Sequence, residues 1–485
     1  MHKKDWLMLS SPETIPVVAI VGGGVSGAAV AYHLAGTGLF GRQQIVLFEP
    51  RALLGAGLAY DTVEPAHRIN VPSTRMSLFP DDPEHFQRWI DTNGALGDDP
   101  DALAASGALY PRRGLFGRYM NAMIRPLVES GSVRHVRERV LSADRLNGRW
   151  HLTGEGGYVI DADILVIATS HPAPSAPEPL ASVLAGDPRF VADPTRRGAL
   201  DPIGVDDRVL IVGNGLTSAD VVAALGLRGH RGQITAVSRR GLRSRGHPSM
   251  PQDPFGDFTS EPAQTASGLL KRVRAAIREA GREGLSWHAV IDQVRGQGEA
   301  LWRGLPVEER RRIARHLRPF WDVHRFRVAP QVEAASEEAI AEGRMTVLAG
   351  SVAEVSIDED RIRCVLRLGR SRQRVERHFD AVVVTTGPGH GGILRSQPFL
   401  AGLAERGYLV NDPTRLGLDC NANSQAIGAS GTATESLFIS GPLARGTFGE
   451  LMGLPQVTEH AVLVASGVAD TVRAMFPATQ RLHSI

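Results

Sequence analysis

The chain has 485 residues, of which 22% are charged, and its formal net charge is +2. This near-neutral balance offers no broad basic surface, so we expect neither nucleic acid nor an acidic membrane surface as a partner. The length suggests about three domains. Two cysteines, Cys364 and Cys420, exclude a disulfide framework and fit a reducing compartment, and they lack the close spacing of a redox-active pair.

The N-terminal residues 1–14 contain no long apolar core, and the next apolar run is interrupted by glycines. Signal peptides and transmembrane helices both need longer apolar stretches. We therefore expect a cytoplasmic protein that does not enter a membrane.

A glycine-rich loop follows the first apolar run. Ile15–Val21 is typical of a buried parallel strand, and Ala28–Leu34 is typical of a helix. Between them, Gly22 permits a tight turn, Gly24 lets the backbone approach a pyrophosphate, and Gly27 lets strand and helix pack closely. The N–H groups at the start of the helix favour phosphate binding. The order strand, loop, helix predicts a dinucleotide site.

An acidic residue supports this interpretation. The next strand, Gln44–Phe48, ends in Glu49, at the distance from the glycines where a carboxylate accepts the ribose hydroxyls. Together with Ser26 in the loop, Glu49 completes a site suited to the adenosine of FAD. The alternative is a glycine-rich loop that merely precedes a buried helix.

The same pattern occurs a second time. A strand at Arg208–Val212 is followed by a loop that contains Gly213, Gly215 and Ser218, and then by a helix. This order predicts a second dinucleotide site.

The second site differs where its acid would stand. After the strand Gln233–Val237 come Ser238, Arg239 and Arg240. Guanidinium groups bind phosphate through paired hydrogen bonds, so this end suits the 2′-phosphate of NADPH. The alternative for the two arginines is an exposed surface turn.

Two further strands end in similar turns, DADILVIATS at 161–170 and DAVVVTTG at 380–387. We predict an α/β protein with two Rossmann-like dinucleotide-binding domains, one inserted into the other, and an extra helical segment. Within that segment, apolar side chains recur at helical spacing at Leu269, Leu270, Val273, Ala276 and Ile277. The predicted domains are an FAD-binding domain at 14–205 and 345–475, and an NADP-binding domain at 206–344 with the helical insertion at about 265–318.

The order of these motifs resembles the flavoproteins with two dinucleotide-binding domains, and in particular a bacterial FAD/NAD(P)-binding family. The segments that carry the resemblance are Gly55–Tyr60, Asn70–Phe79, Tyr110–Tyr119, Gly213–Asp220 and Ser238–Gly241. The segments expected beside the flavin also resemble those of N-hydroxylating monooxygenases. The chain departs from that pattern at the turn Ala168–His171, and at Gly441-Pro442 where Gly-Asp is common.

The resemblance implies an NADPH-dependent flavin monooxygenase that forms a flavin C4a-(hydro)peroxide and oxygenates a small molecule, including at an amine nitrogen. It implies FAD, NADPH, dioxygen and a small-molecule substrate as partners. Asn70 and Met76 are expected around the flavin ring. The alternatives are a turn residue for Asn70 and a core residue for Met76.

A cluster of cationic residues is expected to bind an anionic substrate or the NADP phosphates, and its members are His324, Arg325 and Arg327. Structural salt bridging is an equal alternative for the two arginines. The spacing of histidines, cysteines and acids predicts no metal site.

Two other functions are compatible with the sequence. One is an FAD-dependent NAD(P)H dehydrogenase or reductase that passes electrons on without oxygen insertion, although a disulfide reductase is disfavoured by the missing cysteine pair. The other is a non-catalytic FAD- and NADP-binding protein. An oligomer is compatible with all three.

Overall fold

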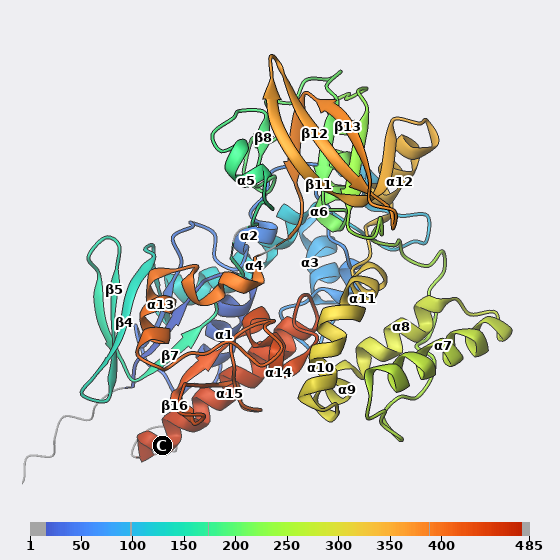
Figure 1. The fold of residues 1–485 in the computed structure, drawn as a ribbon. Coiled ribbons are helices and arrows are strands. Elements are labelled where there is room, and N and C mark those ends of the chain that lie inside the picture. The colour runs from blue at the N-terminus through green and yellow to red at the C-terminus, as the bar shows by residue number, and fades with distance from the viewer. Residues whose placement is uncertain (1–15, 98, 173, 388, 478–485) are drawn as a thin grey trace, which may run out of the picture.

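The computed structural model describes residues 16–477 except 98, 173 and 388. Two domains, each built on a mostly parallel sheet, lie beside a helical segment (Figure 1). This architecture confirms the predicted fold class. Residues 14 and 15, at the start of the predicted first domain, lie outside the described residues. Among the described helices, none is both long enough and apolar enough to cross a membrane.

The first sheet has the strand order β15-β16-β7-β1-β2-β3. Its strands pair in parallel, except that β15 is antiparallel to β16. The strands are β1 (Val18–Val21), β2 (Ile45–Phe48), β3 (Val133–Val136), β7 (Ile164–Ile167), β15 (Gln425–Ile427) and β16 (Ala433–Ile439). The central strands β1, β2 and β7 are buried along their whole length, which is why the sequence shows them as continuous apolar runs.

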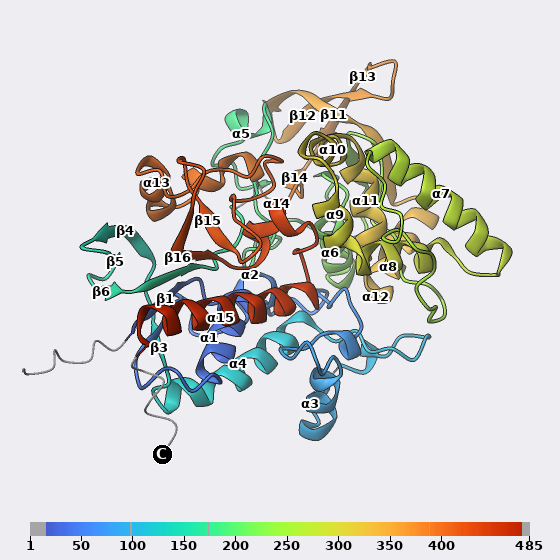
Figure 2. The same cartoon turned by 90° about the horizontal axis from the view of Figure 1, so that it is seen from below.

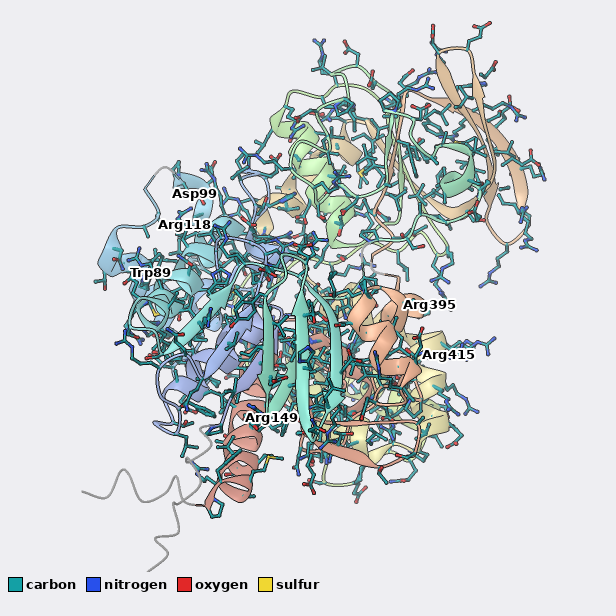
Figure 3. All side chains as sticks on the ribbon, turned by 90° about the vertical axis from the view of Figure 1, so that its left-hand side faces the viewer. Trp89, Asp99, Arg118, Arg149, Arg395 and Arg415 are labelled. Atoms are coloured by element: carbon teal, nitrogen blue, oxygen red, sulfur yellow. The ribbon has the colours of Figure 1, made fainter. Side chains whose placement is uncertain are left out.

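Alternate residues of these strands face two different hydrophobic layers. On one face, α1 (Val25–Ala35), α4 (Arg113–Glu129) and α15 (Gln456–Met475) lie side by side (Figure 2). On the other face, the sheet packs against α13 (Pro398–Glu405) and a three-stranded antiparallel sheet. Figure 3 shows that small sheet facing the viewer, with Arg149 at one end. Its strands are β4 (Val140–Leu146), β5 (Arg149–Gly154) and β6 (Val159–Ala162).

Short elements complete the first domain. They are α2 (Gly57–Tyr60), η1 (Ser73–Arg75), α3 (His85–Asn93), η2 (Pro100–Ala102), η4 (His390–Arg395), η5 (Gly441–Ala444) and α14 (Arg445–Phe448). The segment between α2 and α4 is anchored by Asp99, labelled in Figure 3, which accepts hydrogen bonds from the buried guanidinium of Arg68 at 2.9 and 3.1 Å.

The second sheet has the order β13-β12-β11-β10-β9-β14-β8. Its strands are β8 (Phe190–Val191), β9 (Val209–Val212), β10 (Ile234–Ser238), β11 (Met345–Asp358), β12 (Arg361–Leu368), β13 (Gln373–Phe379) and β14 (Ala381–Val384). Helix α6 (Leu216–Leu227) packs against α12 (Pro330–Ala341), and α5 (Leu180–Val183) lies near β11.

The predicted boundaries between the domains are wrong at both ends of the insertion. The prediction places residues 345–384 in the FAD domain, but β11 pairs in parallel with β10, and β14 pairs in parallel with β9. At the other end, β8 pairs with β14, so the second domain already begins before residue 205. The reason is that the strands before the two similar turns belong to different sheets. Strand β14, before Thr385-Thr386-Gly387, pairs with β9, just as β7, before Ala168-Thr169-Ser170, pairs with β1.

The helical segment forms a separate layer beside the first domain (Figure 1). It comprises α7 (Ala266–Arg282), α8 (Trp287–Gly296), α9 (Gly298–Gly304), α10 (Val307–Arg312), the π-helical turn η3 (Ile313–Leu317) and α11 (Arg318–Arg325). The predicted helical insertion thus begins where expected and continues a little further along the chain. Helix α9 contacts α14, which joins the segment to the first domain.

Candidate functional site

The first glycine loop follows β1 and lies against the turn that follows β7. Gly22 has φ +104°, and a Cβ atom there would lie 2.6 Å from the carbonyl oxygen of Ala168, so only glycine fits. A Cβ atom on Gly27 would overlap the carbonyl oxygen of Gly22. This tight packing brings the start of α1 against the carboxyl edge of the sheet, where nucleotide phosphates bind in such folds.

Glu49 is fixed at the end of β2. The residue is 4% exposed, and its Oε2 atom accepts a hydrogen bond from the Gly23 N–H at 3.0 Å. Its Oε1 atom accepts from the backbone N–H of Arg51 at 3.1 Å. The carboxylate is therefore held beside the glycine loop, as a ribose-binding acid requires.

A contact from the end of the chain closes the same loop. Gly441 has φ +74°, and a Cβ atom there would overlap the Ser26 hydroxyl. The Gly441 N–H donates to Nδ1 of His460 at 3.1 Å, and Nε2 of His460 donates to the hydroxyl of Ser424 at 2.9 Å. Burial lowers the pKa of His460 to about 3, so the imidazole is neutral and can accept at Nδ1. Nothing in the sequence marked His460 for this position.

Buried polar atoms without a partner mark the edge of the first sheet. The Thr169 Oγ1 and Ser440 Oγ atoms, just beyond β7 and β16, have no hydrogen-bond partner among the described residues. Such atoms are rare in folded proteins and are expected where a ligand supplies the missing bond. The residues at this edge therefore fit a bound dinucleotide.

The second glycine loop repeats the geometry at β9 and β14. Gly213 has φ +113° and lies against the carbonyl of Thr385, as Gly22 lies against Ala168. Gly215, by contrast, has no atom within 4 Å of its Cβ position. The Asn214 Nδ2 and Ser218 Oγ atoms are buried without a partner among the described residues. Open space and unpaired polar atoms together fit a second nucleotide.

The two arginines after β10 are accessible. Arg239 and Arg240 are exposed, and neither forms an ion pair with a residue that the structure describes. The Arg240 guanidinium lies over the ring of Phe320, 5.3 Å from its centre. Both charges are thus available beside Ser238, at the end of the strand where a 2′-phosphate would lie.

Asn70 and Met76 occupy different environments. The Asn70 Oδ1 atom is buried without a partner among the described residues, and its carbonyl oxygen accepts from Nε2 of His247 at 2.9 Å. Burial lowers the pKa of His247 to about 4. Because His247 follows β10, Asn70 lies where the two domains meet. Met76 is 2% exposed within the hydrophobic layer beneath α1 and α4, which agrees with the alternative of a core residue.

Arg325 and Arg327 are both neutralised by carboxylates. Arg325 donates to Glu450 at 2.7 Å, and Arg327 lies 2.9 Å from Asp292. Both side chains are buried. These contacts favour structural salt bridging over the predicted binding of substrate, and the sequence concealed them because the partners lie elsewhere in the chain.

The two cysteines are chemically protected. Cys364 lies in β12 of the second sheet, and Cys420 lies in the first domain beside Thr447. Both are buried, and burial raises the pKa of each thiol to about 12. Neither thiol is suited to exchange electrons with a disulfide, since the reactive species is the thiolate.

A cavity of about 420 Å³ lies within the helical segment. Apolar side chains from α7, α8, α9, η3 and α11 form most of its wall, and Arg445 and Glu450, which follow β16, form part of the rest. The helical spacing of Leu269, Val273 and Ile277 was visible in the sequence. Periodicity alone did not show that this face would border a cavity.

Residues 19–172 match a family model described as FAD-NAD(P)-binding. This region contains the first glycine loop, Glu49 and the strand β7. No curated protein matches the chain.

Solved structures with the same fold span nearly the whole chain. The reduced form of an ornithine hydroxylase from Pseudomonas aeruginosa is 16% identical, with a TM-score of 0.65, and the match covers 95% of this chain and 100% of that one. A cadaverine monooxygenase from Erwinia amylovora, bound to FAD, is 12% identical with a TM-score of 0.65, and the coverage is 94% and 95%. A thioredoxin reductase from Lactococcus lactis is 11% identical with a TM-score of 0.52, covering 95% and 99%. The chain therefore has the two-domain fold of FAD- and NADP-binding flavoproteins.

Proposed function

We propose that this protein is an FAD-dependent, NADPH-using monooxygenase that oxygenates a small organic molecule. Such cofactors supply hydride transfer from NADPH to the flavin, and reduced flavin supplies electrons to dioxygen. The observation that carries the proposal is a substrate-sized cavity in the helical segment, part of whose wall comes from residues that follow β16 in the sheet that bears the first nucleotide loop.

The chain connects this cavity to the nucleotide loop over a short distance. Gly441 packs on Ser26 of the loop, and Arg445 lines the cavity four residues later. Four residues span at most about 14 Å. In open α/β sheets, ligands bind beyond the carboxyl ends of the strands, and the segment that follows β16 links this edge of the sheet to the cavity, which supports the proposal.

The side chains have separable tasks in this proposal. Glu49 accepts the ribose hydroxyls, and the N–H groups at the start of α1 bind the pyrophosphate. Arg239 and Arg240 bind the 2′-phosphate of NADPH. Asn70 offers an unpaired acceptor where the domains meet. The apolar wall of the cavity excludes water from the reacting molecule, which suppresses the wasteful release of peroxide.

A reductase that transfers electrons to a disulfide has less support. The thioredoxin reductase match has the same fold, but here both thiols are buried and their pKa values are raised. A reductase with an organic acceptor stays compatible with the cavity, and the following experiment separates it from a monooxygenase.

The test is the fate of isotopically labelled dioxygen. The purified flavoprotein is supplied with NADPH, labelled dioxygen and a series of medium-chain organic compounds. We expect one labelled oxygen atom in the product and little peroxide. Turnover of NADPH under nitrogen with a quinone acceptor, and no label in any product in air, would establish the reductase instead.

A further inference from the structure

The side chains that line the cavity of the helical segment favour one chemical class of ligand. We propose that it binds a substrate with an apolar body and a neutral or anionic end group, and that it rejects the free cationic amines accepted by an ornithine or cadaverine hydroxylase. The assignment of this ligand as the substrate rests on the proposed function.

The wall is made of apolar side chains that the fold leaves only half-buried. Among these side chains are Leu269 and Val273 of α7, Trp287 of α8 and Trp302 of α9. Its volume of about 420 Å³ is within the range of sites that enclose a small organic molecule. Covering these half-buried side chains with an apolar ligand is favourable, because it removes apolar surface from water. The ammonium group of an amino acid would lose its hydration against this apolar wall.

The charged groups at the cavity favour an anion over a cation. Arg274, Arg318 and Arg445 all contribute to the wall. Arg445 is buried, and its Nε atom donates to the carbonyl oxygen of Gly449 at 3.2 Å. This excess of arginines at the wall makes the entry of an ammonium group unfavourable.

The carboxylates do not offset this excess. Among the described residues of the wall, Glu450 is the one carboxylate, and it accepts from Arg325 and from the indole N–H of Trp321, each at 2.7 Å. Asp322 lies 3.8 Å from both Arg318 and Arg445. Counting these acids with the arginines around them leaves the cavity with more cationic than anionic groups, and Asp322, whose Oδ1 atom forms no hydrogen bond among the described residues, faces two of those arginines.

The first test is the binding of a neutral fluorescent probe, N-phenyl-1-naphthylamine, to the purified flavoprotein. We substitute Val273→Trp to fill the cavity and Ala275→Trp, on the exposed side of the same helix, as the matched control. Val273→Trp should weaken probe binding by at least about tenfold, which Ala275→Trp should not do. Flavin content and circular dichroism confirm that both variants are folded. Equal binding by the two variants would overturn the assignment of the cavity.

The second test compares end groups of opposite charge on one apolar chain. Decanoate and decylamine compete with the bound probe in separate titrations. We expect decanoate to displace the probe at a concentration about tenfold lower than decylamine does. Equal potency, or a preference for decylamine, would overturn the proposed selectivity. Neither titration uses NADPH or dioxygen, so these results are independent of the isotope experiment, whose failure would refute oxygenation and leave the binding site intact.

Discussion

The two nucleotide loops have the same backbone and different surroundings. Gly22 and Gly213 adopt the same unusual φ and lie against the same kind of turn. Around the first loop, however, the strand that follows ends in a buried acid, Glu49, and Gly441 closes over the loop. Around the second, the space at Gly215 is open, and the strand that follows leads to exposed arginines.

This difference indicates how long each nucleotide stays bound. A buried site with contacts from distant parts of the chain releases its ligand slowly, because local opening must precede release. An open site that recognises phosphate through exposed charges binds and releases quickly, and salt weakens it. The first loop is thus suited to a resident cofactor such as FAD, and the second to a nucleotide such as NADPH that exchanges at every turnover.

The largest effect is expected from matched glycine substitutions in the two loops. Gly24→Val places a branched side chain where the pyrophosphate must approach the first loop, so the protein should purify with less than about a tenth of its flavin. Gly215→Val makes the equivalent change in the second loop. It should leave flavin content unchanged and raise the KM for NADPH. Absorbance of the purified variants measures the first outcome, and steady-state kinetics the second.

If Gly24→Val retains its flavin, the first loop is not the resident site. If Gly215→Val loses flavin as well, the two sites are not independent, and the comparison fails.

A smaller effect is expected from acid at the first loop. Burial lowers the pKa of His460 from 6.5 to about 3, so the folded protein keeps this imidazole neutral while the unfolded chain takes up a proton. The contribution of the neutral His460 to stability is therefore full above pH 6.5 and is lost as the pH falls toward 3. At pH 5 the loss is about 2 kcal/mol.

Denaturant unfolding at pH 7 and pH 5 measures this loss, and His460→Gln removes the titrating group while keeping a polar side chain. The variant should lose about 2 kcal/mol less than the wild type between the two pH values. An identical pH dependence would show that His460 does not hold Gly441 in the way described.

Features that are encoded by neighbouring residues could be predicted from the sequence. Both glycine loops and the acid at Glu49 were found because strand, turn and helix are adjacent in the chain. The domain boundary was missed because β11 and β14 take their places through pairing with β10 and β9, which local patterns do not reveal.

Charged and apolar side chains were harder to interpret for the same reason. Arg325 is neutralised by Glu450, which lies far away in the chain, and the sequence around Arg325 does not indicate this partner. His460 likewise could not be identified from its neighbours in the sequence, because its role depends on the hydrogen bond that it accepts from Gly441. The apolar face of α7 was predicted, but whether such a face is covered or borders a cavity depends on how the helices pack.

In the proposed reaction, NADPH at the second loop reduces a flavin held at the first. Anaerobic mixing with NADPH or NADH, followed by flavin absorbance, tests it directly in the wild type, in Arg239→Ala and in Arg370→Ala, a control for the loss of an exposed arginine. We predict rapid bleaching by NADPH. We also predict that Arg239→Ala needs about ten- to a hundredfold more NADPH, since a charge-assisted hydrogen bond contributes about 1.5–3 kcal/mol, with NADH unaffected. Flavin that dithionite reduces but NADPH does not, or an equal loss with both nucleotides, would contradict the claim.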